Sequence, residues 1–241
     1  MFNILISTLA AAALGAGLFL GAGLSPWIAG FAGLVLFTAL YLLLMRHFMN
    51  KLVALMEQSQ RELQGRHIER AINTLEKGYQ FASWQLYVKE QINSQIGTVH
   101  YLNRNFSEAF EFLKKGFMRH WVALCMLAIC YMKRNRTKDM IAAFERAVAA
   151  GKKEPLAWAV YAFCLEKVGQ RDKAISILEK GLKKTGNDVN LQLNLEDLRE
   201  GERMRMKGYG DMWYQFHLDK PGALIKKQTK AVQGRRKIVR R

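Results

Sequence analysis

The first forty-five residues of this chain contain no Asp, Glu, Lys or Arg, and Arg46 is the first such side chain. A segment this apolar favours lipid over water, and about 20 apolar residues cross the hydrocarbon core of a bilayer as one helix. The segment is therefore long enough for two spans, which we predict at about residues 4–24 and 27–45. Residues 1–48 are accordingly predicted to form a transmembrane helical hairpin.

A short turn separates the two predicted spans. It ends in Ser25-Pro26, where Ser25 can cap the second helix and Pro26 suits its first turn, because the N–H that proline lacks would be unpaired there. A cleaved signal peptide is not favoured, since no basic region precedes the apolar run, the run is too long, and a second apolar span follows at once. A single long span with a re-entrant piece is the alternative to the hairpin.

The side of the membrane follows from the first charges. Arg46, His47 and Lys51 follow the second span, whereas the turn carries no Lys or Arg. Cytoplasmic loops of membrane proteins are enriched in Lys and Arg, so the positive-inside rule places both ends of the hairpin in the cytoplasm. The sequence therefore predicts a multi-pass membrane protein with two spans and a cytoplasmic soluble domain.

Small residues recur at four-residue spacing in each span. Ala13, Gly17 and Gly21 share one face of the first span, and Ala29 and Gly33 share a face of the second. Small residues let helix backbones approach closely, which is how helices associate in lipid. We predict that these five residues pack the two spans against each other; a docking face for another membrane protein is the alternative.

The segment 49–208 has the pattern of successive helices. Apolar residues recur at helical spacing, turn-forming residues separate them at short intervals, and Pro155 is its single proline. No helix breaker lies between Met45 and Gln64, so the second membrane helix is expected to continue into the soluble part. The pattern predicts an all-α fold in which residues 187–207 form a terminal capping helix.

A small–large–small pattern also repeats within this segment. The first position is Ala71, Ala109, Met140 and Ala174, with spacings of 38, 31 and 34 residues. A large residue follows four positions later, and a small one three positions after that: Leu75, Leu113, Phe144 and Leu178, then Gly78, Gly116, Ala147 and Gly181. The pattern, over about residues 66–186, resembles the tetratricopeptide repeat, from which Met140 and Arg104 depart. It predicts an α-solenoid of about three to four repeats, because no single repeat can bury its own apolar face.

The resemblance implies a protein-interaction scaffold whose first helices line a concave surface. No Lys or Arg stands at the positions that clamp a carboxylate in chaperone-binding members of the family. These positions are Gln91, Ser94, Gln95, Thr98, Val122, Cys125, Met126, Ile129, Ala159, Val160 and Phe163. The groove instead looks apolar, and the resemblance assigns Tyr101, Met126, Ile129, Met132 and Phe163 to protein binding. The alternative is that some of them pack against the terminal helix.

The tail, residues 209–241, is first aromatic and then basic, and we predict it to be partly disordered. Trp213, Tyr214 and Phe216 are expected to tie its start to the repeats, and no acid follows Asp219. Its cations are Lys226, Lys227, Lys230, Arg235, Arg236, Lys237, Arg240 and Arg241, within a chain of formal net charge +17. Such a run suits anionic lipid headgroups, and equally nucleic acid or the ribosome. A solvated end that aids solubility is the third interpretation.

The sequence carries no recognisable catalytic or metal-binding motif. Cys125, Cys130 and Cys164 form no C-x-x-C pair, and the five histidines are scattered. We therefore predict no enzyme activity, no cofactor, no metal and no small-molecule substrate.

These patterns predict a membrane-anchored scaffold or assembly factor that recruits or positions a protein partner at a membrane complex. A membrane tether for ribosome or nucleic acid through the basic tail is one alternative. A periplasm-facing assembly chaperone built on the same repeat is another.

Overall fold

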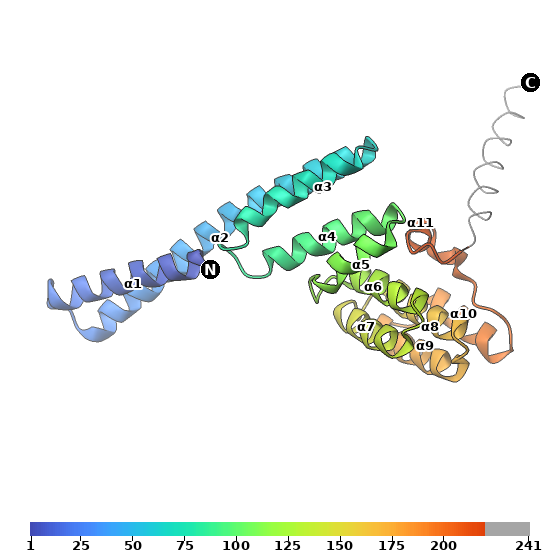
Figure 1. The fold of residues 1–241 in the computed structure, drawn as a ribbon. Coiled ribbons are helices and arrows are strands. Elements are labelled where there is room, and N and C mark those ends of the chain that lie inside the picture. The colour runs from blue at the N-terminus through green and yellow to red at the C-terminus, as the bar shows by residue number, and fades with distance from the viewer. Residues whose placement is uncertain (220–241) are drawn as a thin grey trace, which may run out of the picture. The chain divides into compact units, whose positions relative to one another are not determined.

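The computed structural model describes residues 1–219, so the predicted cationic residues from Lys226 to Arg241 lie outside the described residues. Within residues 1–219 every regular element is helical, which confirms the all-α fold (Figure 1). The elements are α1 (Phe2–Leu20), α2 (Pro26–Gln64), α3 (Ile68–Glu76), η1 (Lys77–Phe81), α4 (Val88–Leu102), α5 (Phe106–Lys114), α6 (Trp121–Lys133), α7 (Thr137–Ala150), α8 (Pro155–Lys167), α9 (Arg171–Thr185), α10 (Val189–Arg199), η2 (Met206–Tyr209) and α11 (Asp211–Tyr214).

The chain forms two compact units. Within the described residues, unit 1 comprises Met1–Tyr101 and Phe106–Ala123, and unit 2 comprises Leu102–Asn105 and residues 124–219.

In unit 1, α1 and α2 form an antiparallel pair (Figure 1). The helix α2 starts with Pro26 in its first turn, as predicted, and runs without interruption to Gln64. At a rise of 1.5 Å per residue its 39 residues measure about 58 Å. Roughly its first half matches the second predicted span, and the rest packs against other helices of unit 1. The expected continuation of this helix past Met45 is therefore present.

The second half of α2 builds the core of unit 1 with α3 and α4. The core side chains, each at most 5% exposed, are Leu52, Leu75, Val88, Ile92, Ile96 and Val99. The helix α3 returns along α2 (Figure 1), and the hydroxyl of Ser59 donates to the carbonyl of Ala71 at 3.1 Å. Gly78 lies against Ile92, whose Cδ1 would be 2.8 Å from a Cβ at that glycine. The first predicted copy of the repeat, which contains Ala71, Leu75 and Gly78, thus has small residues at close contacts.

The next copy pairs α4 with α5. A Cβ on Gly97 would lie 2.8 Å from Cγ of Leu113, and a Cβ on Gly116 would lie 2.7 Å from the Ser94 hydroxyl. Only glycine permits these approaches, because the neighbouring atoms include backbone. The order of small and large residues therefore reflects direct helix contact.

Unit 2 continues the same architecture with α7, α8 and α9. Ala174 and Leu178 are fully buried, and a Cβ on Gly181 would lie 2.9 Å from the Cβ of Trp158. Met140, which is larger than the repeat usually allows at its position, is also fully buried. The helix pairs and these contacts define a tetratricopeptide-like α-solenoid.

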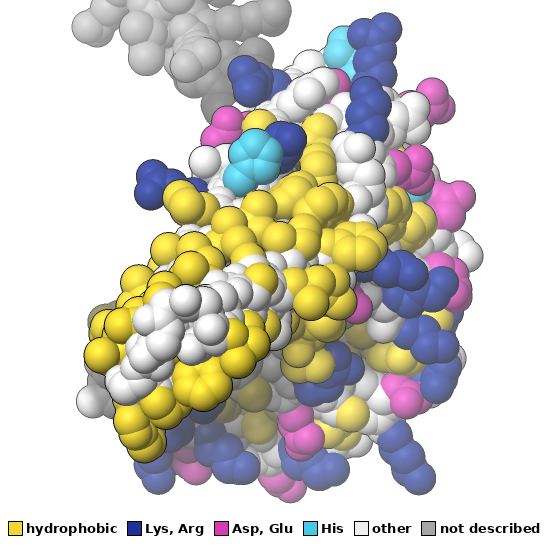
Figure 2. Space-filling view, turned by 90° about the vertical axis from the view of Figure 1, so that its left-hand side faces the viewer, with side chains coloured by type: hydrophobic (Ala, Val, Ile, Leu, Met, Phe, Trp, Pro, Cys, Tyr) yellow, Lys and Arg dark blue, Asp and Glu magenta, His cyan; other side chains and the backbone are white. Residues whose placement is uncertain are grey.

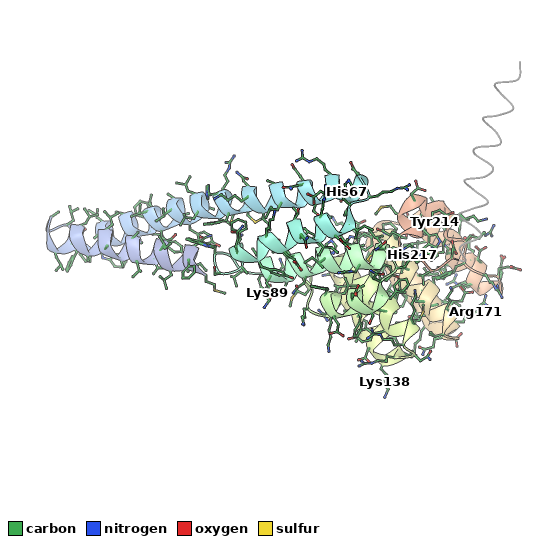
Figure 3. All side chains as sticks on the ribbon, turned by 45° about the horizontal axis from the view of Figure 1, so that its top comes forward. His67, Lys89, Lys138, Arg171, Tyr214 and His217 are labelled. Atoms are coloured by element: carbon green, nitrogen blue, oxygen red, sulfur yellow. The ribbon has the colours of Figure 1, made fainter. Side chains whose placement is uncertain are left out.

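The terminal helix is shorter than predicted. The helix α10 ends at Arg199, because Gly201 adopts φ = 91° and turns the chain out of the helix. Arg171 lies at the start of α9 (Figure 3). Its guanidinium donates to the carbonyls of Leu198 and Glu202 and holds this turn. The predicted helix over 187–207 is therefore replaced by α10 and an irregular segment that leads to η2.

Candidate functional site

The surface of the α1–α2 pair is unusually apolar. Both helices are long and apolar enough to cross a membrane. In each helix, only 11% of an apolar stretch of 18 residues is buried. Trp27 is 87% exposed, Leu20 79%, Phe31 69% and Leu43 67%. Figure 2 looks toward this end of the molecule and shows hydrophobic side chains covering the paired helices. A core helix of a soluble protein would instead bury most of these side chains.

The two helices approach each other closely where small residues meet. Cβ atoms built on Gly33 and Gly15 would lie 3.1 Å from the carbonyl oxygen of Ala11 and 3.6 Å from that of Ala29. The structure therefore places the predicted residues Ala29 and Gly33 in the contact between the helices.

The predicted residues of α1 lie on another face. Ala13, Gly17 and Gly21 are exposed, and a Cβ on Gly17 would have no neighbour within 4 Å. Ala11 and Gly15 occupy the contact in their place. They have the same four-residue spacing as the predicted set, so the sequence signal fits both faces of α1 equally well.

Aromatic side chains gather where the α1–α2 pair meets the rest of unit 1. Trp84 stacks on Phe48 of α2 with ring centroids 4.4 Å apart and meets the ring of Phe2 edge-on at 5.4 Å. The carbonyl of Ser83 accepts hydrogen bonds from the Met1 amino group and from the backbone N–H of Phe2, the latter at 3.0 Å. The start of α1 is thus fastened to the segment between η1 and α4.

The predicted groove residues fall into two groups. Tyr101, Met126 and Ile129 have no exposed surface, whereas Met132 and Phe163 are half-buried. A fully buried side chain fills the core and offers no contact area to a partner in this conformation. The first three therefore act in packing here. Binding by any of the five stays a prediction.

The chain's own C-terminal segment covers Phe163. Trp213 of α11 is 1% exposed, and its ring meets Phe163 edge-on at 4.8 Å. The indole N–H of Trp213 donates to the carboxylate of Asp219 at 2.6 Å, and Nζ of Lys167 donates to the carbonyl of Leu218 at 2.9 Å. The aromatic start of the tail is therefore packed onto the repeats.

Each unit contains a cavity, which is lined in part by α4 in unit 1 and by α8 in unit 2. In unit 2 a cavity of about 510 Å³ is lined by Phe163, Glu166, Lys167, Arg203, Met204, Leu218 and Asp219. In unit 1 a cavity of about 260 Å³ is lined by Met56, Gln91, Ser94, Gln95, Phe117, Arg119 and His120. The unit 1 cavity includes Gln91, Ser94 and Gln95, three of the positions that the resemblance to the repeat implies for a concave surface. The unit 2 cavity has cations and carboxylates that the sequence pattern did not identify, because they come from segments far apart in the chain.

Buried titratable groups in these units have packing roles. Burial raises the pKa of the Cys125 and Cys164 thiols well above the ordinary value, and raises that of Cys130 to about 11. Such thiols are protonated at neutral pH and are poor nucleophiles and metal ligands. Within residues 1–219 no group of three or more His, Cys, Asp or Glu side chains is arranged to hold a metal ion.

His120 lines the cavity of unit 1 and is largely buried. Its Nδ1 accepts a hydrogen bond from the backbone N–H of Ala123 at 3.2 Å, which requires that nitrogen to be unprotonated. Burial lowers the pKa of His120 in the same direction. The imidazole is therefore neutral at physiological pH and caps the start of α6.

The solved structures that resemble this chain do so at low sequence identity. No protein-family model and no curated protein sequence matches the chain. Among solved structures it is similar to "MamA RS-1 ArsTM double mutant", with a TM-score of 0.46 and 17% identity over 69% of this chain and 93% of that chain. It is also similar to "Crystal structure of MamA protein", with a TM-score of 0.45 and 14% identity over 76% of this chain and 94% of that chain. The assignment as an α-solenoid rests on the helix pairs and buried small residues described above.

Proposed function

We propose that this protein is a membrane-anchored helical-repeat scaffold that holds a protein partner beside the bilayer. The exposed apolar surface of α1 and α2 is the observation that carries the proposal. Apolar surface removed from water stabilises by about 25 cal/mol per Å², so two helices with such surfaces strongly favour lipid. The alternative is that α1 and α2 are core helices of a soluble protein. It fits poorly, because only 11% of the apolar 18-residue stretch of each helix is buried.

The charges next to the apolar pair support a cytoplasmic location for the repeats. Arg46, His47 and Lys51 are all exposed on α2, within two turns of the end of the predicted span. The turn at residues 21–25, at the other end of the pair, carries no charge. This asymmetry is typical of a hairpin with both ends in the cytoplasm.

The unit 1 cavity is our candidate for partner contact. Gln91 and Gln95 lie one turn apart on α4, and they bring amide donors and acceptors to a cavity that Met56 and Phe117 make partly apolar. A peptide or helix with one apolar anchor and polar neighbours fits this chemistry. We propose that such a segment belongs to a subunit of a membrane complex, which the scaffold recruits or positions.

Two measurements on the full-length chain test this function together. After alkaline carbonate extraction, the protein should stay in the membrane fraction. A photo-crosslinking amino acid in place of Gln95 should give a defined protein adduct in cells, whereas the same substitution at Lys138, exposed on α7, should not. Release into the soluble fraction would contradict the anchoring, and identical adducts at both positions would contradict the binding site.

A further inference from the structure

Two loops of unit 1 expose large apolar side chains next to each other. Leu86 and Tyr87, between η1 and α4, are 42% and 50% exposed, and Met118, between α5 and α6, is 58% exposed. The ring of Tyr87 lies 5.6 Å from that of Phe117, so the two loops are in contact. We call residues 82–89 and 115–119 the paired-loop surface.

The paired-loop surface is also strictly basic. It contains Lys89, Lys115 and Arg119, all exposed, and neither loop contains an Asp or Glu. Lys89 projects outward from the first turn of α4 (Figure 3). Exposed apolar side chains flanked by cations, without neighbouring acids in the same loops, match the interface of an anionic bilayer.

The first of these loops lies beside the start of α1, which relates it to the boundary of the bilayer. The 19 residues of α1 measure about 28 Å, close to the hydrocarbon thickness of about 30 Å. If α1 crosses the bilayer, its first residue lies at one boundary of the hydrocarbon core. Ser83 accepts hydrogen bonds from Met1 and Phe2, so the first loop lies at that boundary too. Leu86 follows Ser83 by three residues and therefore lies within about 10 Å of that boundary.

The aromatic cluster around Trp84 fits the same location. Trp84 and Phe48 stack next to the start of α1, and Lys51 places its ammonium 6.0 Å from the centre of the Phe48 ring. Trp is enriched at membrane–water interfaces, where Lys and Arg extend toward headgroups. The boundary of the membrane would then pass near Phe48, three residues beyond the predicted end of the second span.

From these observations we infer that the paired-loop surface binds the anionic phospholipid headgroups of the bilayer that holds the hairpin. This inference rests on the proposed membrane anchoring. Lys89, Lys115 and Arg119 contact lipid phosphates, while Leu86 and Met118 enter the interfacial layer. The contact holds the soluble part of unit 1 at the membrane surface.

The test uses the full-length chain in lipid nanodiscs of phosphatidylcholine, with or without phosphatidylglycerol. An environment-sensitive fluorophore is attached to a Leu86→Cys chain, and in separate samples to Met118→Cys and to Val189→Cys. Val189 is an exposed apolar residue of unit 2 and serves as the matched control. We expect blue-shifted emission at positions 86 and 118 that increases with phosphatidylglycerol, and no such dependence at position 189.

Charge variants then identify the responsible residues. Replacing Lys89, Lys115 and Arg119 together by Gln should abolish the phosphatidylglycerol-dependent shift at positions 86 and 118. Replacing the exposed Lys138, Lys173 and Lys184 of unit 2 by Gln removes the same charge and should leave the shift intact. Both variants keep the basic tail, so the tail contributes equally to each.

Three results would overturn the inference. The first is a water-like emission at positions 86 and 118 in both lipid mixtures. The second is a blue shift that persists in detergent without phospholipid, which would show a protein contact. The third is an equal effect of both triple variants. A chain that fails to incorporate into nanodiscs would instead refute the proposed membrane anchoring itself.

Discussion

Glycine and alanine residues determine how closely the helices of this protein approach one another. Gly33 and Gly17 are both glycines of apolar helices, yet only Gly33 lies against a neighbouring backbone. The sequence could predict that small residues matter in α1, but not which of two equivalent faces meets α2. That choice depends on the rotation of α1 about its axis, which three-dimensional packing determines.

Substitution at these two glycines distinguishes the faces. Gly33→Leu should destabilise the full-length protein in detergent by about 1–3 kcal/mol, because the backbone carbonyl of Ala11 cannot move away from the new side chain. Gly17→Leu should change stability by less than about 0.5 kcal/mol. Thermal unfolding followed by circular dichroism measures both. A larger loss for Gly17→Leu would contradict the observed contact.

His120 should make stability depend on pH. Because burial lowers its pKa in the folded protein, the unfolded chain binds more protons, and stability falls as pH drops through the unfolded value of about 6.5. His217, whose pKa burial also lowers, acts with the same sign. The Asp197 carboxylate, held by Arg205 with a lowered pKa, loses its contribution only at much lower pH.

Denaturation midpoints at about pH 7.5 and about pH 5.5 test this dependence. His120→Gln should reduce the difference between the two midpoints, whereas His67→Gln, at an exposed turn between α2 and α3 (Figure 3), should leave it unchanged. An undiminished pH dependence in the His120→Gln chain would exclude this role.

At the scale of elements, the sequence predicted helix pairing well and groove exposure poorly. The small–large–small order placed Ala174, Leu178 and Gly181 correctly because each sits at a helix crossing. The helix α6 is apolar on all faces, so residue type alone could not show that Met126 and Ile129 point inward. Contact between Trp213 and Phe163 joins residues fifty positions apart, which local periodicity does not detect.

The α8–α9 pair can be tested by overpacking. Ala174→Leu should cost about 1–3 kcal/mol, since the alanine has no exposed surface and the added atoms have no space. Lys184→Leu, at an exposed position of the same helix, should be nearly neutral. Equal thermal midpoints for these two variants would refute the repeat assignment.

The packed C-terminal segment should contribute to the stability of unit 2. Trp213→Ala removes a side chain that is 1% exposed and should cost about 3–5 kcal/mol, whereas Met212→Ala, at a residue that is 53% exposed, should cost little. Chemical denaturation of the full-length chain measures the difference. If Trp213→Ala unfolds at the same denaturant concentration as the parent, the segment is not part of the folded unit.

At the scale of the whole molecule, the uninterrupted helix α2 connects the proposed membrane hairpin to the repeats of unit 1. The absence of a breaker between Met45 and Gln64 was sufficient to predict this continuity. The fastening of Met1 and Phe2 to Ser83 could not be predicted, because a backbone carbonyl in a loop carries no sequence signal. Both features join the proposed membrane hairpin to the rest of unit 1.

Cysteine labelling in intact cells tests this anchoring most directly. The native Cys125, Cys130 and Cys164 are at most 2% exposed, so an introduced cysteine reacts first with a membrane-impermeant maleimide. We expect a Leu24→Cys chain to be labelled from outside the cytoplasmic membrane. A Lys51→Cys chain should be labelled only after that membrane is permeabilised. Labelling of Lys51→Cys in intact cells, or protection of both positions, would contradict a hairpin that presents the repeats to the cytoplasm.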